Sequence, residues 1–490
     1  MSEKFILSID QGTSATKCVL IDKRGRIAAR AAAPLGESYP AAGWVDQDPE
    51  EIWNSIAKAA HACLDGRSPS SIEAVALSTQ RESMLLWDRN TGKPLSNLVS
   101  WQDRRSVDAC EELQSAGHGP LVRERSGLPL DPMFSALKAK WLLDTYDPKR
   151  EKAQRGEVCL GTVDSFFLSR FAGDDHLTEA GNASRTQLLN VRTGQWDPDL
   201  LDIFSIPRNA LPRVTPSNGP FPALRGIDGL PDGIPVLAVL GDSHAALFGH
   251  GAFNPGQVKA TYGTGSSVMG LVEDADRLHP GICLTIAWQM DAISLAAEAN
   301  IRSSGATLKW VAGLLGIDAA EAAELARKHA EANGDRPVLI PGFNGLGAPW
   351  WDNAASGLIS GLRLDSDRGS LCLAALESIP NQIMDVVEIL EEGGLDVRAL
   401  FADGGPTRNG FLMQLQADLS DTRVLCSRDA ELSALGAAHM AGIGVGWWGL
   451  DELSGMERLR ETYVPVMALE ERVRRRACWQ NALSKARTKQ

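Results

Sequence analysis

Two short apolar runs near the start of the chain, residues 5–9 and 18–21, flank a small polar turn. Short apolar runs on either side of turn residues predict a β-hairpin. The same pattern returns in the other half of the chain, where candidate strands at 257–260 and 268–272 flank a turn rich in glycine and threonine. Two such turns, one in each half, predict a duplicated fold that holds one phosphate chain from both sides.

Between and after these turns, the hydrophobic pattern alternates between helix-like and strand-like segments. Apolar residues at helical spacing predict helices near 52–64, 304–315, 321–331, 369–392, 410–419 and 434–442. Short apolar runs predict strands near 72–77, 98–100, 234–240 and 400–402, and a polar segment follows each of them. The chain is therefore expected to be an α/β protein, in which ligands bind at the carboxyl ends of the strands.

Length and charge limit the class of protein. A chain of 490 residues is too long for one hydrophobic core. We expect two domains, 1–250 and 251–490, because glycine, proline and asparagine concentrate at 249–256. The net charge is −13, and no nucleic-acid partner is expected, because nucleic-acid surfaces need clustered basic side chains. The basic clusters at 474–476 and 485–489 are interpreted as a solvated helix face and a frayed tail.

Cysteine usage and hydropathy indicate the cellular compartment. The eight cysteines are scattered without a CxxC pair, which is typical of reduced thiols in a cytosolic enzyme. The N-terminus lacks the pattern of a signal peptide, and no apolar run reaches transmembrane length. We therefore expect a cytoplasmic protein without a membrane partner.

The first polar turn carries side chains suited to a phosphorylated ligand and a divalent cation. Asp10 is a hard oxygen ligand suited to Mg²⁺, and Lys17 can meet phosphate charge. Thr13 and Ser14 supply hydroxyl donors, while Gly12 lets the backbone approach a ligand closely. These residues alone favour an ordinary hairpin with a polar turn. The second turn shifts the interpretation toward a phosphate site.

Two further segments carry candidate chemistry. Arg81-Glu82, at a strand end, places a forked cation beside an acceptor, which suits the adjacent hydroxyls of a polyol. Asp242 follows an apolar strand and can serve as a general base, although an N-cap of the next helix is a common and chemically idle alternative. The segment 241–245 half-matches a hydrolase nucleophile elbow but lacks its last glycine. A serine hydrolase is therefore only a remote alternative.

Taken together, these residues resemble the FGGY carbohydrate kinases, and among them the glycerol kinases most. The resemblance runs nearly end to end and rests on the order of its motifs more than on any one of them. In the first half the motifs are Asp10-Gln-Gly-Thr13, Thr79-Gln-Arg-Glu82, Trp101-Gln-Asp-Arg-Arg105, Gly127-Leu-Pro-Leu-Asp131, Asn182-Ala-Ser-Arg185 and Gly241-Asp242. In the second half they are Tyr262-Gly-Thr-Gly265, Gly345-Leu-Gly-Ala-Pro-Trp350, Asp403-Gly-Gly405 and Ala434-Leu-Gly-Ala437.

The resemblance implies a fold, cofactors and a set of roles. The family fold has two actin-like (ribonuclease H-like) domains that close over ATP and a sugar or polyol in the cleft between them. Asp242 would be the general base, and Asp10 would hold Mg²⁺. The residues that would contact the polyol are Arg81, Glu82, Trp101, Met133, Asp242 and Ser243. The residues that would contact the nucleotide are Thr13, Ser14, Lys17, Gly263, Thr264, Gly305, Gly405 and Asn409.

Two departures from the family pattern concern the polyol site. Met133 stands where glycerol kinases carry a substrate-contacting tyrosine, and Ser243 stands where they carry a glutamine. Both changes leave a roomier and less polar pocket. The hypothesis is therefore an ATP-dependent kinase of a small polyol or ketose. Glycerol is the leading substrate, and a C4 or C5 polyol or ketose follows close behind.

The main alternative is a non-catalytic actin-like ATPase or sugar-sensing module. The intact acids Asp10, Glu82 and Asp242 count against it. The two interpretations differ in whether ATP turnover rises on adding a polyol and yields a phosphorylated product. A homodimer is expected from the family alone.

Overall fold

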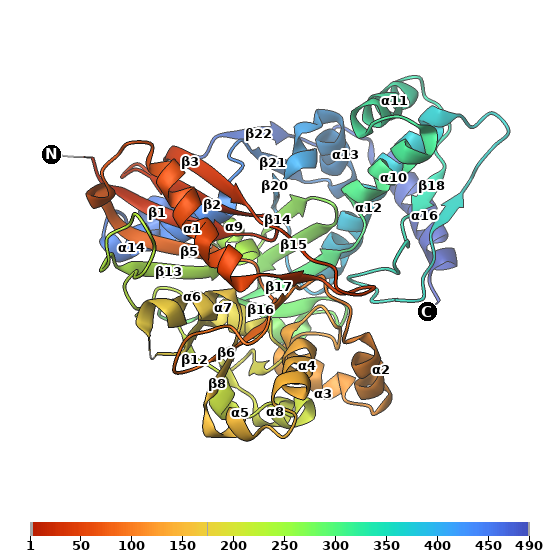
Figure 1. Ribbon diagram of the computed structural model, residues 1–490. Coiled ribbons are helices and arrows are strands. Elements are labelled where there is room, and N and C mark those ends of the chain that lie inside the picture. Colours follow the sequence, from red (N-terminus) through yellow and green to blue (C-terminus); the bar gives the residue numbers. More distant parts are fainter. Residues whose placement is uncertain (1–2, 174, 489–490) are drawn as a thin grey trace. The chain divides into compact units, whose positions relative to one another are not determined.

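The computed structural model describes residues 3–173 and 175–488, which form two compact units (Figure 1). Unit 1 takes in the described residues up to Gly251 together with Leu284–Leu295 and Glu431–Met456. Unit 2 takes in Ala252–Cys283, Ala296–Ala430 and the described residues from Glu457 onward. The units are therefore not two consecutive segments of the chain. The domain boundary expected at 250–251 stays a prediction.

Unit 1 is built on a five-stranded sheet in the order β13-β5-β1-β2-β3. Its strands are β1 (Phe5–Gln11), β2 (Ala15–Ile21), β3 (Ile27–Pro34), β5 (Ile72–Thr79) and β13 (Val236–Gly241). β1 and β2 form the predicted hairpin, with Asp10 directly opposite Lys17. β1, β5 and β13 run parallel. Their carboxyl ends therefore lie at one edge of the sheet, where α/β proteins bind ligands.

Helices cover both faces of this sheet, which explains why its strands are nearly continuous apolar runs. α1 (Pro49–Leu64) and α6 (Val163–Ala172) pack on one face in a common core. Asp48 caps α1 by accepting the backbone N–H of Glu50. α14 (Leu432–Val445) packs on the other face and against α9 (Asp242–Gly249). The two helices are so close that a Cβ on Gly436 would lie 1.8 Å from the Ala245 carbonyl oxygen.

Short helices and two-stranded sheets fill the chain between β5 and β13, and this region carries part of the site described below. Its strands are β6 (Leu85–Asp88), β7 (Leu98–Val99), β8 (Val158–Gly161), β9 (Leu177–Glu179), β10 (Leu189–Asn190), β11 (Gln195–Trp196) and β12 (Arg213–Thr215), and β4 (Asp46–Gln47) pairs with β7. Its helices are α2 (Val107–Ser115), α3 (Gly119–Ser126), α4 (Ser135–Tyr146), α5 (Glu151–Arg155), α7 (Ala180–Ser184) and α8 (Pro198–Phe204). α15 (Leu450–Ser454) follows α14.

Unit 2 contains most of a seven-stranded sheet in the order β16-β17-β15-β14-β20-β21-β22. The strands are β14 (Gln257–Tyr262), β15 (Ser266–Leu271), β16 (Cys283–Gln289), β17 (Ile293–Ile301), β20 (Ala399–Asp403), β21 (Arg423–Ser427) and β22 (Arg460–Tyr463). β14 and β15 form the second predicted hairpin. β14, β20 and β21 run parallel, so unit 2 repeats the hairpin-and-parallel-strand arrangement of unit 1.

The core of unit 2 lies between this sheet and a group of helices. The helices are α10 (Gly305–Leu315), α11 (Ala319–Glu331), α12 (Arg368–Glu392), α13 (Gly410–Ser420) and α16 (Leu469–Ala486), and β18 (Val338–Ile340) pairs with β19 (Leu358–Ser360) beside them. α12 is central, because α10, α11 and α13 all pack against it. The predicted helices and strands of this half are present, with ends that differ by a few residues.

The basic cluster 474–476 corrects one interpretation. It does lie on a helix, α16, but Arg476 is buried instead of solvated. Its guanidinium donates to the carboxylates of Asp385 and Glu388 at 2.8 and 2.7 Å, and to the amide oxygen of Asn381. Arg476 therefore ties α16 to α12. The sequence of the cluster alone did not reveal the acids, because they lie about 90 residues upstream.

The cysteines agree with the expectation of unpaired thiols. All eight cysteines are free, seven of them are buried, and Cys478 is exposed. Among the described residues, no helix is both long and apolar enough to cross a membrane.

Candidate active site

Three acidic positions meet at the carboxyl edge of the unit 1 sheet. Asp10 lies near the end of β1, and Glu82 follows β5. Asp242 follows β13 directly. In the strand register Asp10 is opposite Ser78, and Thr79 is opposite Gly241. Residues separated by more than 200 positions in the sequence are therefore brought together by parallel pairing, as the sequence analysis expected.

Asp242 is the first residue of α9 and does not cap it. The N-cap is Gly241, although the Asp242 carboxylate accepts one N–H of the helix start, that of Ser243, at 2.6 Å. The carboxylate Oδ1 of Asp242 lies 3.3 Å from the Nε of Arg81, and the side chain is 40% exposed. A carboxylate that is partly exposed and held by a cation is able to accept a proton from a bound hydroxyl.

Arg81 is held in place from two sides. Its terminal nitrogen lies 3.1 Å from Nε2 of the buried His244. Because a guanidinium only donates, Nε2 accepts this hydrogen bond and the other imidazole nitrogen carries the proton. A Cβ on Gly241 would lie 2.5 Å from the Cδ of Arg81, so the side chain crosses directly over this glycine. His244 is a site residue that the sequence analysis missed, since nothing local pairs it with Arg81.

Glu82 is buried and has a left-handed backbone, with φ of 62°. Positive φ is uncommon for residues other than glycine and concentrates at functional sites. The hydroxyl of Ser135 donates to the carbonyl oxygen of Glu82 at 2.9 Å, and the Nε of Arg185 donates to its carboxylate at 2.6 Å. Arg185, whose cation lies over the ring of Phe134, fixes the Glu82 carboxylate. The sequence motif contained Arg185 but assigned it no role.

The remaining acceptor-site candidates lie at the surface of unit 1. Trp101 is partly exposed, and its indole N–H donates to the hydroxyl of Thr13 at 3.0 Å. Met133 and Ser243 are both half-buried. Met133 follows the buried Asp131, whose carboxylate accepts the N–H of Met133 at 2.9 Å.

The first polar turn has a definite charge arrangement. Burial raises the pKa of Asp10 to about 6, and the hydrogen bond from Ser78 at 2.8 Å opposes this rise. Lys17 forms an ion pair with Glu431 at 2.8 Å, a partner 414 positions away that the sequence analysis did not find. Ser14 is exposed in the same turn. Asp10 thus offers a carboxylate that favours a nearby cation, while Lys17 already has a counter-charge.

Glu179 is a second buried acid with a raised pKa. Glu179 accepts hydrogen bonds from the N–H groups of Gly181 and Asn182 and from the hydroxyl of Ser217. Burial raises its pKa to about 7. Because these bonds cap the start of α7, Glu179 fixes the segment that carries Arg185.

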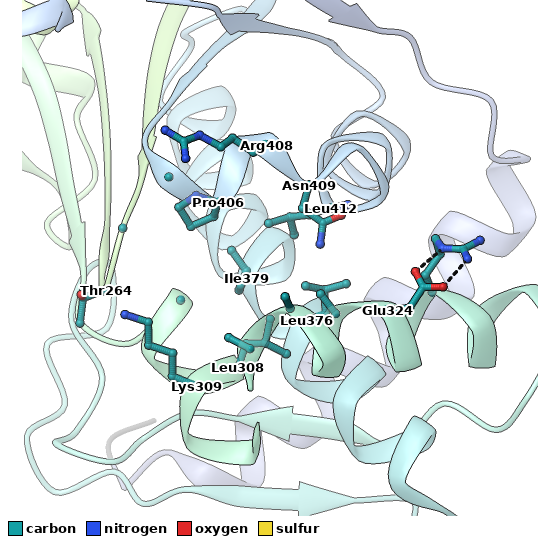
Figure 2. A pocket seen from close by; sticks show the side chains of 17 residues that line it. Thr264, Leu308, Lys309, Glu324, Leu376, Ile379, Pro406, Arg408, Asn409 and Leu412 are labelled. Atoms are coloured by element: carbon teal, nitrogen blue, oxygen red, sulfur yellow. Dashed lines mark hydrogen bonds and ion pairs between the residues drawn. The ribbon is translucent and has the colours of Figure 1, made fainter. Parts of the chain in front are cut away.

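Unit 2 contains a pocket of about 690 Å³ that brings together most of the predicted nucleotide residues (Figure 2). Gly263, Thr264, Gly305, Gly405 and Asn409 all line it. Its apolar wall consists of Leu308, Leu376, Ile379 and Leu412. A flat aromatic ring can lie against such a wall, while the glycine turns offer backbone N–H groups to anions.

Two glycines, Gly305 in this pocket and Gly404 beside it, are required by close backbone contacts. The N–H of Gly305 donates to the carbonyl oxygen of Gly263 at 2.9 Å, and a Cβ on Gly305 would lie 2.6 Å from the same oxygen. Gly404 has φ of 96°, and a Cβ there would lie 1.9 Å from the Tyr262 carbonyl oxygen. The chain at Gly305 and at Gly404 therefore contacts the backbone of 262–263 with no room for a side chain. Gly305 also starts α10, and a helix N-terminus favours phosphate.

Three cations line the same pocket, Lys309, Arg327 and Arg408, and all were missed from the sequence. Lys309 and Arg408 are both exposed, and within the described parts of the chain neither forms an ion pair. Figure 2 shows the amino group of Lys309 pointing toward Thr264. Glu324 lines the far side, where it pairs with Arg327 at 2.6 Å. The pocket thus has a cationic end near the glycine turn.

Comparison with known proteins identifies the family. Residues 5–249 match the N-terminal domain of the FGGY family of carbohydrate kinases, and residues 258–445 match its C-terminal domain. The chain belongs to the FGGY carbohydrate kinases. It is a phosphotransferase with an alcohol group as acceptor, acting on a sugar or small polyol.

Individual relatives agree along the full length. The chain is 39% identical to glycerol kinase 2 of Thermotoga maritima over 493 residues, covering 99% of both chains. It is 40% identical to apulose kinase of Pectobacterium atrosepticum over 488 residues, covering 98% of both. The solved glycerol kinase of Plasmodium falciparum with ADP is 27% identical, with a TM-score of 0.92 over 99% of this chain and 98% of that one. The two-domain, actin-like fold expected from the sequence is therefore confirmed.

FGGY kinases use ATP with Mg²⁺, and the residues present fit both. The unit 2 pocket combines an apolar wall with glycine turns, as a nucleotide requires. Among the described residues no cluster of three or more His, Cys, Asp or Glu could hold a metal alone. A single carboxylate is nevertheless enough, because Mg²⁺ is usually bound by one or two carboxylates plus substrate phosphates.

Proposed function

We propose that this kinase transfers the γ-phosphoryl group of ATP to a hydroxyl of a small polyol or ketose. Glycerol is the leading candidate, and C4 and C5 polyols or ketoses follow close behind. The observation that carries the proposal is the arrangement of Arg81, Glu82 and Asp242 at one sheet edge. Arg81 lies 3.3 Å from the Asp242 carboxylate and 4.0 Å from that of Glu82. A cation between two acceptors can bind a diol through both of its oxygens and both of its protons.

In the proposed mechanism, Asp242 accepts the proton of the attacking hydroxyl at its carboxylate. Arg81 and Glu82 orient the acceptor, and Trp101 covers it. Asp10 would hold Mg²⁺, which neutralises phosphate charge when bound. Phosphoryl transfer depends mainly on positioning and charge neutralisation, so these residues need no covalent role.

The nucleotide residues are proposed on the same basis. Gly263, Thr264, Gly305, Gly405 and Asn409 would bind the nucleotide in unit 2, because all line one pocket. Thr13, Ser14 and Lys17 would contact phosphate from unit 1. For Lys17 this requires that the phosphate replaces or joins Glu431 as its counter-charge.

The relatives leave the acceptor open between two classes. One is named for glycerol and another for apulose, a ketose, and the identities are 39% and 40%. Met133 and Ser243 are the positions of the proposed acceptor site at which this chain departs from the glycerol kinase pattern. We therefore place the choice between a triol and a longer ketose at these two residues. A cytoplasmic location and a homodimer also stay proposals.

The test is a coupled ADP-release assay with Mg-ATP and a panel of acceptors. The panel contains glycerol, erythritol, threitol, erythrulose, apulose, xylitol, ribitol, xylulose and ribulose, and mass spectrometry identifies the product. The expected result is acceptor-dependent ADP release with a phosphorylated product for at least one small polyol or ketose. ADP release that no acceptor increases, with no phosphorylated product, would contradict the proposal.

A further inference from the structure

Lys138 is a buried cation beside the proposed acceptor site. Its side chain is fully buried, and its ammonium donates to three backbone carbonyl oxygens. The acceptors are Pro132 at 2.7 Å, Met133 at 2.5 Å and Phe134 at 3.1 Å. One side chain therefore holds the three consecutive peptide groups that precede α4.

This position is costly for a lysine. Lys138 lies in the first turn of α4, where the helix dipole disfavours a positive charge. Burial lowers the pKa of Lys138 to about 8. Glu82, Asp103 and Asp131 face it and oppose this fall, while Arg105 adds to it. No carboxylate of the described chain forms an ion pair with it.

The segment that Lys138 holds carries one proposed acceptor-site residue, Met133, and leads directly into a contact with another, Glu82. Met133 lies in it and donates its N–H to Asp131 at 2.9 Å. Ser135, the first residue of α4, donates to the carbonyl oxygen of Glu82, the residue with the left-handed backbone. The start of α4 therefore connects the Met133 loop to the strained peptide of Glu82.

We propose that Lys138 is a positioning residue for the acceptor: its ammonium group fixes residues 131–134, and through them Met133 and Glu82, in the arrangement that binds the polyol or ketose. The proposal rests on the proposed function for the identity of the acceptor. Loss of one proton leaves the amine with two N–H donors for three carbonyls, so one of these three hydrogen bonds is lost. The loop then loosens, and the KM for the acceptor rises with pH.

The kinetic test compares Lys138→Met with Lys140→Met. Lys140 lies on the same helix but is partly exposed and pairs with Asp144, so it is a matched control. In Lys138→Met we expect the KM for the acceptor to rise about 10-fold, with the KM for ATP unchanged. In the wild type and Lys140→Met, the acceptor KM should rise between about pH 7 and 9, and in Lys138→Met this rise should be absent. Equal changes in both KM values, or the same pH profile in all three proteins, would overturn the proposal.

A second measurement needs neither the Lys138→Met variant nor any kinase activity. The methyl carbon of Met133 is followed by NMR in protein labelled with [methyl-¹³C]methionine, and Met133→Leu assigns its signal. We expect the signal to shift with a midpoint near pH 8, while that of Met269, buried in unit 2, stays constant. A Met133 signal unchanged from pH 7 to 9 would overturn the proposal. If no acceptor is phosphorylated, the proposed function fails, but this titration still decides whether Lys138 controls the loop.

Discussion

The proposed acceptor site of unit 1 and the proposed nucleotide pocket of unit 2 differ in the kinds of groups that would contact the ligand. In unit 1 the proposed contacts are charged side chains that hold one another: Asp242 to Arg81, Arg81 to His244, and Glu82 to Arg185. In unit 2 the proposed contacts are mostly bare backbone at glycines and an apolar wall. Two cations of the unit 2 pocket, Lys309 and Arg408, are exposed and form no ion pair within the described residues, unlike Arg81 and Lys17 of unit 1.

This difference between the two sites matches the chemistry of the ligands that we propose for them. A polyol or ketose is neutral and small, so it is recognised by a few hydrogen bonds whose donors and acceptors must be fixed in advance. A nucleotide carries several negative charges and a flat ring, which backbone N–H groups and apolar side chains bind without a paired network. Substitutions at the unit 1 site should therefore affect the rate of phosphoryl transfer and the choice of acceptor. Substitutions at the unit 2 pocket should affect the binding of the nucleotide.

The largest expected effect is that of Asp242→Asn in unit 1. Loss of the proposed base should lower kcat by about 10²–10⁴-fold, because an amide cannot accept the proton of the hydroxyl. The KM for ATP should change little if the nucleotide is bound by unit 2. Steady-state kinetics and nucleotide binding by calorimetry measure both quantities. Normal turnover in Asp242→Asn would remove the base assignment.

The next effect concerns the glycine turns of unit 2. In Gly305→Ala the new Cβ would lie 2.6 Å from the Gly263 carbonyl oxygen, which forces the two turns apart. Overpacking of this kind costs about 1–3 kcal/mol, so the KM for ATP should rise about 5- to 150-fold, with acceptor affinity retained.

Gly313 provides the control for this change. It lies on the same helix, and a Cβ there meets nothing within 4 Å. Gly313→Ala should therefore leave the KM for ATP unchanged and stabilise the protein by about 0.5–1 kcal/mol, measured as a rise in Tm. A KM for ATP that rises equally in both variants would mean that helix α10 as a whole, and not the Gly305 contact, determines nucleotide affinity.

The parts of both sites that could be predicted from the sequence are local. Each hairpin is encoded by two apolar runs and the turn between them, so β1–β2 and β14–β15 followed from the pattern. The strand-end positions of Glu82 and Asp242 followed from the apolar strands before them. Such features need only neighbouring residues.

The rest depended on contacts between distant residues. His244 lies 163 positions from Arg81, and Glu431 lies 414 positions from Lys17, so no local spacing could pair them. β17 was missed because three alanines and Glu298 suit a helix as well as a strand. Lys309 was missed because a lone lysine on a helix face is ordinarily solvated. Its role depends on the pocket around it.

Met133→Tyr tests acceptor choice in unit 1. Filling this half-buried position with a larger side chain that bears a hydroxyl should favour a short triol over a longer ketose. One pocket contact typically changes discrimination by about 1–3 kcal/mol, so we expect the ratio of kcat/KM for glycerol to that for the longer acceptor to rise about 10-fold or more. Competition between two acceptors in one reaction, with products separated by mass, measures this ratio directly. An unchanged ratio would mean that Met133 does not determine acceptor choice, which would leave Ser243 as the candidate.

The smallest effect is expected for Lys309→Ala in unit 2. An exposed cation adds at most about 1 kcal/mol to the binding of a charged group, so the KM for ATP should rise by about 5-fold or less. Because salt screens such a contact, the difference from wild type should shrink as the ionic strength rises toward about 1 M. Lys328→Ala is the control, because Lys328 is also exposed but lies 3.5 Å from the carboxylate of Glu324. If Lys309→Ala instead altered the acceptor KM and left that for ATP unchanged, the division of labour between the two units would be wrong at this residue.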